Sequence, residues 1–168
     1  MATFEKLHVW EQRLFDAMAM VLVVFYSYSA VLEPAATQYH RGIYVIITYV
    51  LVFLLYQSRT RLGRIVDYLL IAASIGTLGY WILNFEVINY RAGAETELDA
   101  AIAMVGVLIG MEVARRVVGN IFIILGSIML LYGVYGAYAP ELISHAGDTF
   151  PDLCTSIFDK SDGVFGIM

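Results

Sequence analysis

The densest group of charged side chains in this sequence is formed by Glu112, Arg115 and Arg116. Their spacing is i, i+3 and i+4, so a helix would place the carboxylate beside both guanidinium groups. Mutual neutralisation would let this group end a helix at a membrane surface, before a turn at Gly119-Asn120. The alternative is that the arginines bind a partner subunit or the anionic headgroups of lipids.

Two isolated aspartates, Asp16 and Asp67, lie near the starts of long apolar stretches. Both are close enough to a membrane surface to reach water or a neighbouring arginine, so we expect them to have structural roles there. The alternative is a proton or sodium site, which needs several convergent oxygen ligands near the middle of the membrane. The chain offers only isolated hydroxyl groups there, on Ser27, Ser74 and Thr77.

The sequence contains no recognisable pattern for catalysis or cofactor binding. His8, His40 and His145 lie outside the apolar stretches, which argues against a membrane-embedded b-type haem. No stretch pairs a serine with an activating histidine, and no P-loop, zinc-type spacing or nucleotide-binding glycine motif is present. The single cysteine, Cys154, excludes an internal disulfide, and we expect it to be buried. We expect no enzyme activity, cofactor or metal.

Five apolar stretches would have to position these residues. The composition, with 60% hydrophobic and 15% charged residues and a mean hydropathy of +0.74, is typical of a membrane protein. The stretches are Leu14–Leu32, Ile43–Tyr56, Ile65–Phe85, Ala100–Val118 and Ile121–Tyr138. A spanning helix needs about 20 apolar residues, and the second and fourth stretches fit this requirement least well. The fourth is alternatively a re-entrant or interfacial helix.

The backbone inside a bilayer must satisfy its own hydrogen bonds, which predicts helices for all these stretches. The predicted fold is therefore all-α, a polytopic transmembrane helical bundle. It has about five membrane helices, or alternatively four, together with short interfacial helices.

The positive charges predict the orientation of the chain. If the N-terminus is cytoplasmic, seven of the ten lysines and arginines lie on that side, as the positive-inside rule requires. These seven are Lys6, Arg13, Arg59, Arg61, Arg64, Arg115 and Arg116. With five crossings the C-terminus is periplasmic.

Three regions follow from this topology: a cytoplasmic interfacial segment over residues 1–13, the membrane bundle over residues 14–138, and a periplasmic tail over residues 139–168. In the tail, Leu153, Ile157 and Phe158 share one helical face. We therefore predict a short amphipathic helix there, lying on the membrane surface or against a partner.

Small residues provide a further contact pattern. Gly106 and Gly110 form a GxxxG motif, which lets the backbones of two membrane helices approach closely. Together with the charged groups, the candidate contacts with lipid or a partner subunit are Arg59, Arg61, Arg64, Gly106, Gly110, Glu112, Arg115 and Arg116.

Short motifs along the chain resemble those of a known transporter family. They are His40-Arg41, Leu54-Leu55-Tyr56, Asn84-Phe85-Glu86, Tyr90-Arg91-Ala92-Gly93, Leu98-Asp99, Glu112 with Arg115-Arg116-Val117-Val118-Gly119, Leu131-Tyr132-Gly133 and Asp162-Gly163-Val164-Phe165-Gly166-Ile167. In these motifs the chain resembles the N-terminal part of the permeases of TRAP (tripartite ATP-independent periplasmic) transporters. The resemblance is to the TAXI type, in which a small and a large membrane subunit are often fused.

The resemblance implies that this chain is the small, four-helix, non-catalytic subunit in the bacterial inner membrane. A large TRAP permease subunit would carry the solute and sodium sites, and a periplasmic TAXI-type solute-binding protein would deliver the solute. The expected partners are these two proteins and the lipid bilayer, with no nucleic acid. The alternative is an accessory or scaffold subunit of another large bacterial membrane complex, whether respiratory, photosynthetic or secretory.

Overall fold

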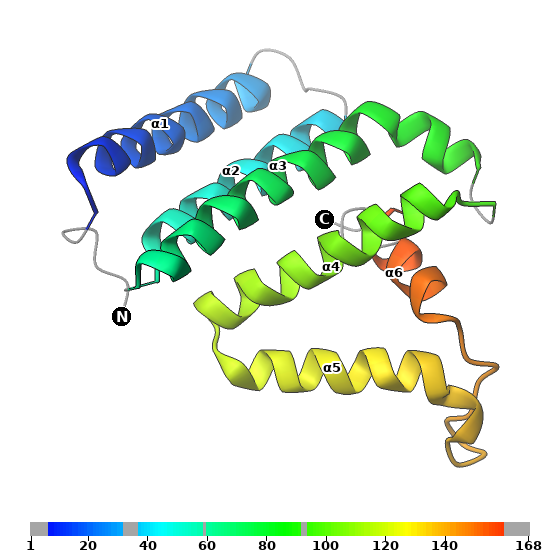
Figure 1. Cartoon of the computed structure of the whole chain (residues 1–168). Coiled ribbons are helices and arrows are strands. Elements are labelled where there is room, and N and C mark those ends of the chain that lie inside the picture. The colour runs from blue at the N-terminus through cyan, green and yellow to red at the C-terminus, as the bar shows by residue number, and fades with distance from the viewer. Residues whose placement is uncertain (1–6, 32–36, 59, 92–93, 160–168) are drawn as a thin grey trace. The chain divides into compact units, whose positions relative to one another are not determined.

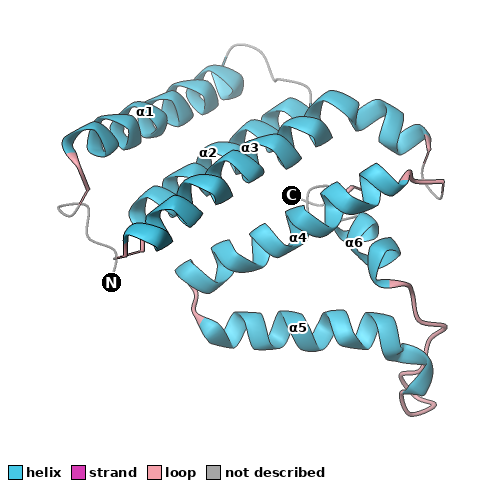
Figure 2. Cartoon of the chain, viewed as in Figure 1, coloured by secondary structure: helices cyan, strands magenta, loops and turns pink. Residues whose placement is uncertain are grey.

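The computed structural model describes residues 7–31, 37–58, 60–91 and 94–159, and every regular element in these ranges is helical (Figures 1 and 2). The helices are α1 (Val9–Val31), α2 (Thr37–Leu55), α3 (Arg61–Tyr90), α4 (Glu97–Val117), α5 (Asn120–Tyr135), the 3-10 turn η2 (Gly136–Tyr138) and α6 (Phe150–Phe158). The predicted all-α class is confirmed. The chain forms two compact units, Met1–Leu83 and Asn84–Met168.

Among the described residues, three helices are long and apolar enough to cross a membrane: Val9–Val31, Arg61–Tyr90 and Asn120–Tyr138. By length and composition they indicate a membrane protein. The apolar part of α2, Tyr39–Leu55, is shorter, and α4 carries charged residues in both its first and last turns. These two helices correspond to the stretches that fit least well in the sequence, so the total of five or four crossings stays a prediction.

In the first unit, one face of α1 packs along α2. Its Tyr26 ring lies edge-on to the rings of His40 and Tyr44, at centroid distances of 4.5 and 5.5 Å. The Tyr26 hydroxyl also donates a hydrogen bond to the His40 carbonyl, at 3.3 Å. The helix α1 begins at Val9, within the segment over residues 1–13 that the sequence predicts at the membrane surface, so that placement stays a prediction.

The helices α2 and α3 approach each other closely at Gly42. A Cβ atom at this position would lie 2.3 Å from Cγ1 of Ile82, so a larger residue would have to displace the Ile82 side chain. Apolar side chains of the same two helices form a core that is almost completely buried. Its most buried members are Phe53, Leu54, Leu78 and Trp81.

In the second unit, α4 begins at a capping box. The Thr96 hydroxyl accepts a hydrogen bond from the Asp99 amide, and the Asp99 carboxylate accepts one from the Thr96 amide, so two amides at the helix start are satisfied. The turn between α4 and α5 contains Gly119, whose φ of 108° is a conformation that favours glycine. Acidic residues in the first turn of α4 and arginines in its last turn match the helix dipole.

The predicted tail helix exists as α6, but its apolar face lies against helices of the same unit. Phe158 covers Gly106 of α4, and Leu153 lies against Gly133 of α5. The expectation that this face would meet the membrane surface or a partner therefore differs from the structure. Cys154 is 0% exposed on this face, which confirms its predicted burial.

Gly106 should be intolerant of even one extra methyl group. A Cβ atom there would lie 2.2 Å from Cε2 of Phe158, whose side chain is buried and has little room to move. We expect Gly106→Ala to lower the free energy of unfolding by about 1–3 kcal/mol, and thermal unfolding in detergent measures this. Gly76→Ala is the matched control, because its Cβ would meet nothing within 4 Å. Equal stability of the Gly106 variant and the wild type would contradict this packing.

The crossing of α4 can be tested with single cysteines at Ala94 and Val118, in a Cys154→Ala background. Val118 is preferable to the neighbouring Gly119 because it is 65% exposed and does not need a positive φ. We expect a membrane-impermeant maleimide to label Ala94→Cys from the periplasm, and Val118→Cys only after the membrane is permeabilised. Labelling of both from the same side would mean that α4 does not cross.

Candidate functional site: charged clusters at the helix ends

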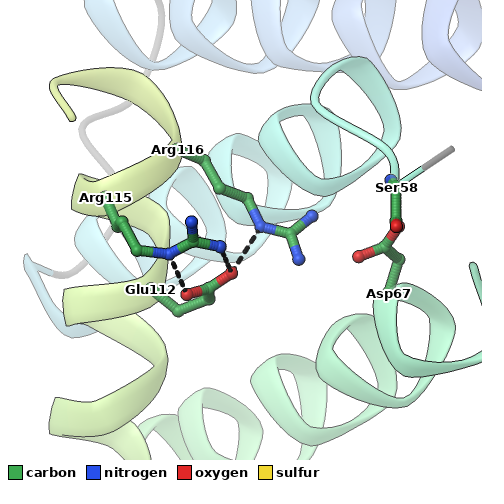
Figure 3. Close-up of polar contacts among 5 residues, drawn as sticks. All are labelled: Ser58, Asp67, Glu112, Arg115 and Arg116. Atoms are coloured by element: carbon green, nitrogen blue, oxygen red, sulfur yellow. Dashed lines mark hydrogen bonds and ion pairs between the residues drawn. The ribbon is translucent and has the colours of Figure 1, made fainter. Parts of the chain in front are cut away.

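The charged cluster predicted from the sequence forms at the last turns of α4 (Figure 3). Arg115 binds the Glu112 carboxylate in a bidentate manner, with Nε 2.7 Å from Oε2 and Nη2 2.6 Å from Oε1. Arg116 donates from its Nε to the same Oε1, at 2.7 Å. The prediction that a helix would bring this carboxylate beside both guanidinium groups is confirmed.

This cluster carries a net charge of about +1 because two guanidinium groups share one carboxylate. The three side chains differ in exposure, at 44% for Arg115, 24% for Glu112 and 11% for Arg116. Arg115 therefore presents the most accessible positive charge, and a guanidinium has more donors than one carboxylate can use. The arrangement is suited to holding a phosphate or carboxylate group, and it contains no group placed to act as a nucleophile.

The arginines at the start of α3 do not form an equivalent cluster among the described residues. Arg61 is exposed and Arg64 is half-buried, while Arg59 lies outside the described residues. The polar group that organises this end is Asp67, which is 1% exposed and accepts a hydrogen bond from the Ser58 amide at 2.7 Å (Figure 3). This bond ties the start of α3 to the α2–α3 connection, which agrees with a structural role for Asp67, while its position at a membrane surface stays a prediction.

Glu11 links parts of the first unit through hydrogen bonds, although the sequence analysis did not identify it. It is 0% exposed, and its carboxylate accepts hydrogen bonds from the Tyr68 hydroxyl at 2.6 Å, the Gln57 side chain at 2.8 Å and the His8 amide at 2.7 Å. Trp10 also stacks on Tyr68, with 6.1 Å between the ring centroids. The cluster joins the start of α1 to the α2–α3 connection. No sequence spacing relates Glu11 to residues so far away in the chain.

A second buried acidic group lies at the start of α4. Asp99 is 1% exposed, and its Oδ2 accepts from the Thr96 amide at 2.9 Å and lies 3.3 Å from Nη2 of Arg91. Asp159, at the end of α6, is also 1% exposed. Burial raises the pKa of the Asp159 carboxyl to about 7, and the charges of Asp99 and Glu95 add to this rise. Asp159 can therefore hold a proton near neutral pH.

The two glycines of the GxxxG motif have different surroundings. Gly106 is buried beneath Phe158, so the contact made at this position is with α6 of the same chain. Gly110, one turn further along α4, is half-buried. The motif serves close helix packing within the second unit, at least at Gly106.

Within residues 7–31, 37–58, 60–91 and 94–159, no group of three or more His, Cys, Asp or Glu side chains is placed to hold a metal ion. The buried carboxylates Glu11, Asp67, Asp99 and Asp159 instead lie near helix ends. Comparison of the chain with protein-family models, curated proteins and solved structures finds no match.

Asp159 should make the stability of the second unit depend on pH. The carboxyl binds its proton more tightly in the folded chain, with a pKa of about 7 against an ordinary value of 3.8, so lowering the pH through this interval stabilises the fold. Asp159→Asn resembles the protonated form. It should raise the free energy of unfolding at pH 8 by up to about 4 kcal/mol, and by less at pH 5.

Thermal unfolding in detergent at the two pH values checks this expectation. Asp148→Asn is the control, because it removes an exposed carboxylate that precedes α6. An Asp159→Asn variant that is less stable than the wild type at pH 8 would show that the ionised carboxylate stabilises the fold.

Proposed function

We propose that this chain is the small membrane subunit of a TRAP-type secondary transporter, where it supports a large permease subunit that carries the solute and ion sites. The observation that carries this proposal is that polar side chains of the long apolar helices form hydrogen bonds within this chain. In α3, Ser74 donates to the Leu70 carbonyl at 2.7 Å, and Thr77 donates to the Ala73 carbonyl at 3.0 Å. These hydroxyl groups are satisfied by their own helix.

Four carboxylates of the described chain are likewise engaged by nearby donors. Glu11, Asp67, Asp99 and Glu112 each accept hydrogen bonds at or near a helix end. A transport site needs several polar groups that converge on one point near the middle of the membrane. The described helices provide none, which favours a supporting role over a solute-carrying one.

The outer surface supports the same proposal. In the most apolar 18-residue stretch of α1, and in that of Asn120–Tyr138, only 6% of the residues are buried within the structure. A membrane helix with so few buried residues is available to lipid and to the helices of another subunit. The sequence motifs that resemble those of TRAP permeases favour this particular subunit, and the positive-inside pattern favours a cytoplasmic N-terminus.

In this proposal the arginines near the cytoplasmic ends have a positioning role. Arg115, which is the most exposed member of its cluster, would contact phosphate groups of anionic lipids, as would Arg61 at the start of α3. Such contacts would fix the depth of the helices in the membrane. They do not require any chemistry by the subunit itself.

The test is purification of the tagged chain from native membranes, combined with solute uptake in cells that lack its gene. We expect a large permease subunit to copurify, and we expect TAXI-dependent uptake to be lost on deletion and restored by the wild-type gene. The control is the purified chain alone in vesicles, which should move no solute. Copurification with a respiratory, photosynthetic or secretory complex, with uptake unchanged, would favour the accessory-subunit alternative and contradict the proposal.

A further inference from the structure

The helix α6 is short, and few side chains hold it against the rest of its unit. It has nine residues, of which Cys154, Thr155 and Phe158 are buried. It packs mainly against α4, with a smaller contact to α5 (Figure 1). A helix shorter than about 12 residues is marginal in water without such packing. A small change in the free energy of docking therefore decides whether α6 stays in place.

The carboxyl group of Asp159 stands at an unfavourable place for a negative charge. Asp159 is the C-cap residue of α6 and is 1% exposed. The C-terminal end of a helix carries a partial negative charge, and burial further disfavours an ionised carboxylate. The last turn of α6 contains no basic residue, and the next residue, Lys160, lies outside the described residues.

The groups of α4 that face Asp159 add more negative charge. Asp99 is 1% exposed, and together with Glu95 and with burial it raises the pKa of the Asp159 carboxyl to about 7. The nearby positive charge belongs to Arg91, whose Nη2 lies 3.3 Å from Oδ2 of Asp99. That guanidinium therefore compensates Asp99, which is already part of the capping box of α4.

The other elements around α6 supply no compensating charge. The helix α5 contains no acidic, basic or histidine residue, and its ionisable side chains are Tyr132 and Tyr135. The phenol of tyrosine is neutral near pH 7. Within α6 itself the acidic residue is Asp152, which is exposed in the first turn. A proton is the remaining means of neutralising Asp159 while α6 is docked.

We propose that α6 is a proton-operated latch, in which a proton on Asp159 keeps α6 docked on α4 and α5, and loss of this proton releases it. This inference goes beyond the proposed function and does not depend on it. Release would uncover Gly106 of α4 and Gly133 of α5, which Phe158 and Leu153 now cover. With the predicted periplasmic C-terminus, the proton would come from the periplasm.

The direction of the pH effect follows from the two states. The docked form binds the proton more tightly, with a pKa of about 7 for Asp159 against an ordinary value of 3.8. Docking is therefore strongest in acid and weakens as the pH rises through about 7.

The first experiment uses Cys154, the single cysteine of the chain, which is 0% exposed while α6 is docked. The full chain in lipid nanodiscs is treated with a small methanethiosulfonate reagent at pH 6 and at pH 9. Each rate is divided by the rate for Asp159→Asn at the same pH, which removes the ordinary effect of pH on the thiol. We expect this ratio to rise about tenfold, because a group with a pKa of about 7 is about nine-tenths protonated at pH 6 and ionised at pH 9. An equal ratio at both pH values would overturn the proposal.

The second experiment tests whether Asp159 is the group that titrates. Glu95→Gln removes a charge that raises the pKa of Asp159, so the pH midpoint of Cys154 labelling should move to lower pH. Glu97→Gln is the matched control, because it removes an exposed carboxylate from the first turn of α4 and should leave the midpoint unchanged. Equal midpoints for Glu95→Gln and the wild type would overturn the assignment of the proton to Asp159.

The third measurement tests whether the release is local. Far-UV circular dichroism at pH 9 should keep nearly all of the helical signal seen at pH 6, because α6 contributes nine of the 168 residues. A large loss of helical signal at pH 9 would mean that the unit unfolds as a whole, which would overturn the latch.

Discussion

The structure depends on one constraint, which is that a membrane interior offers no hydrogen bonds to polar groups. Each polar side chain must therefore find a partner within reach or lie where water is available. In α3 the hydroxyl groups of Ser74 and Thr77 donate hydrogen bonds to carbonyl oxygens of the preceding turn, so they need no partner on a neighbouring helix. Larger polar groups, such as Glu11 and Asp99, lie at helix ends and collect several donors each.

The same clusters also hold helices together. The Glu11 carboxylate receives donors from three separate parts of the first unit, so it links the start of α1 to the α2–α3 connection. In the second unit the capping box and Arg91 fix Asp99 at the start of α4, while Phe158 packs into the space left by Gly106. Polar contacts thus define the ends of the helices, and close packing at glycine defines their separation.

The sequence was informative wherever the deciding contact is local. The Glu112 cluster follows from spacings of three and four residues, and the helix at Phe150–Phe158 follows from the apolar face of Leu153, Ile157 and Phe158; both are present. The sequence was uninformative where two contacting residues are far apart in the chain. Periodicity shows which face of a helix is apolar, but it does not show which other helix covers that face. The Glu11–Tyr68 bond and the Phe158–Gly106 contact are of this kind. Burial of a carboxylate within a polar segment leaves no compositional signal.

The charges at both ends of α4 explain why hydropathy is ambiguous for this helix. Its uncharged centre runs from position 100 to position 111, about 12 residues or about 18 Å, which is less than the roughly 30 Å of a hydrocarbon core. If α4 crosses the membrane, its terminal charges must enter or border the apolar region. Asp99 is paired with Arg91 and forms a neutral group, whereas Glu112 with Arg115 and Arg116 keeps a net charge of about +1, which lipid headgroups at a membrane surface accommodate. Local ion pairing therefore makes a crossing by this short helix physically reasonable, although its composition alone argues against one.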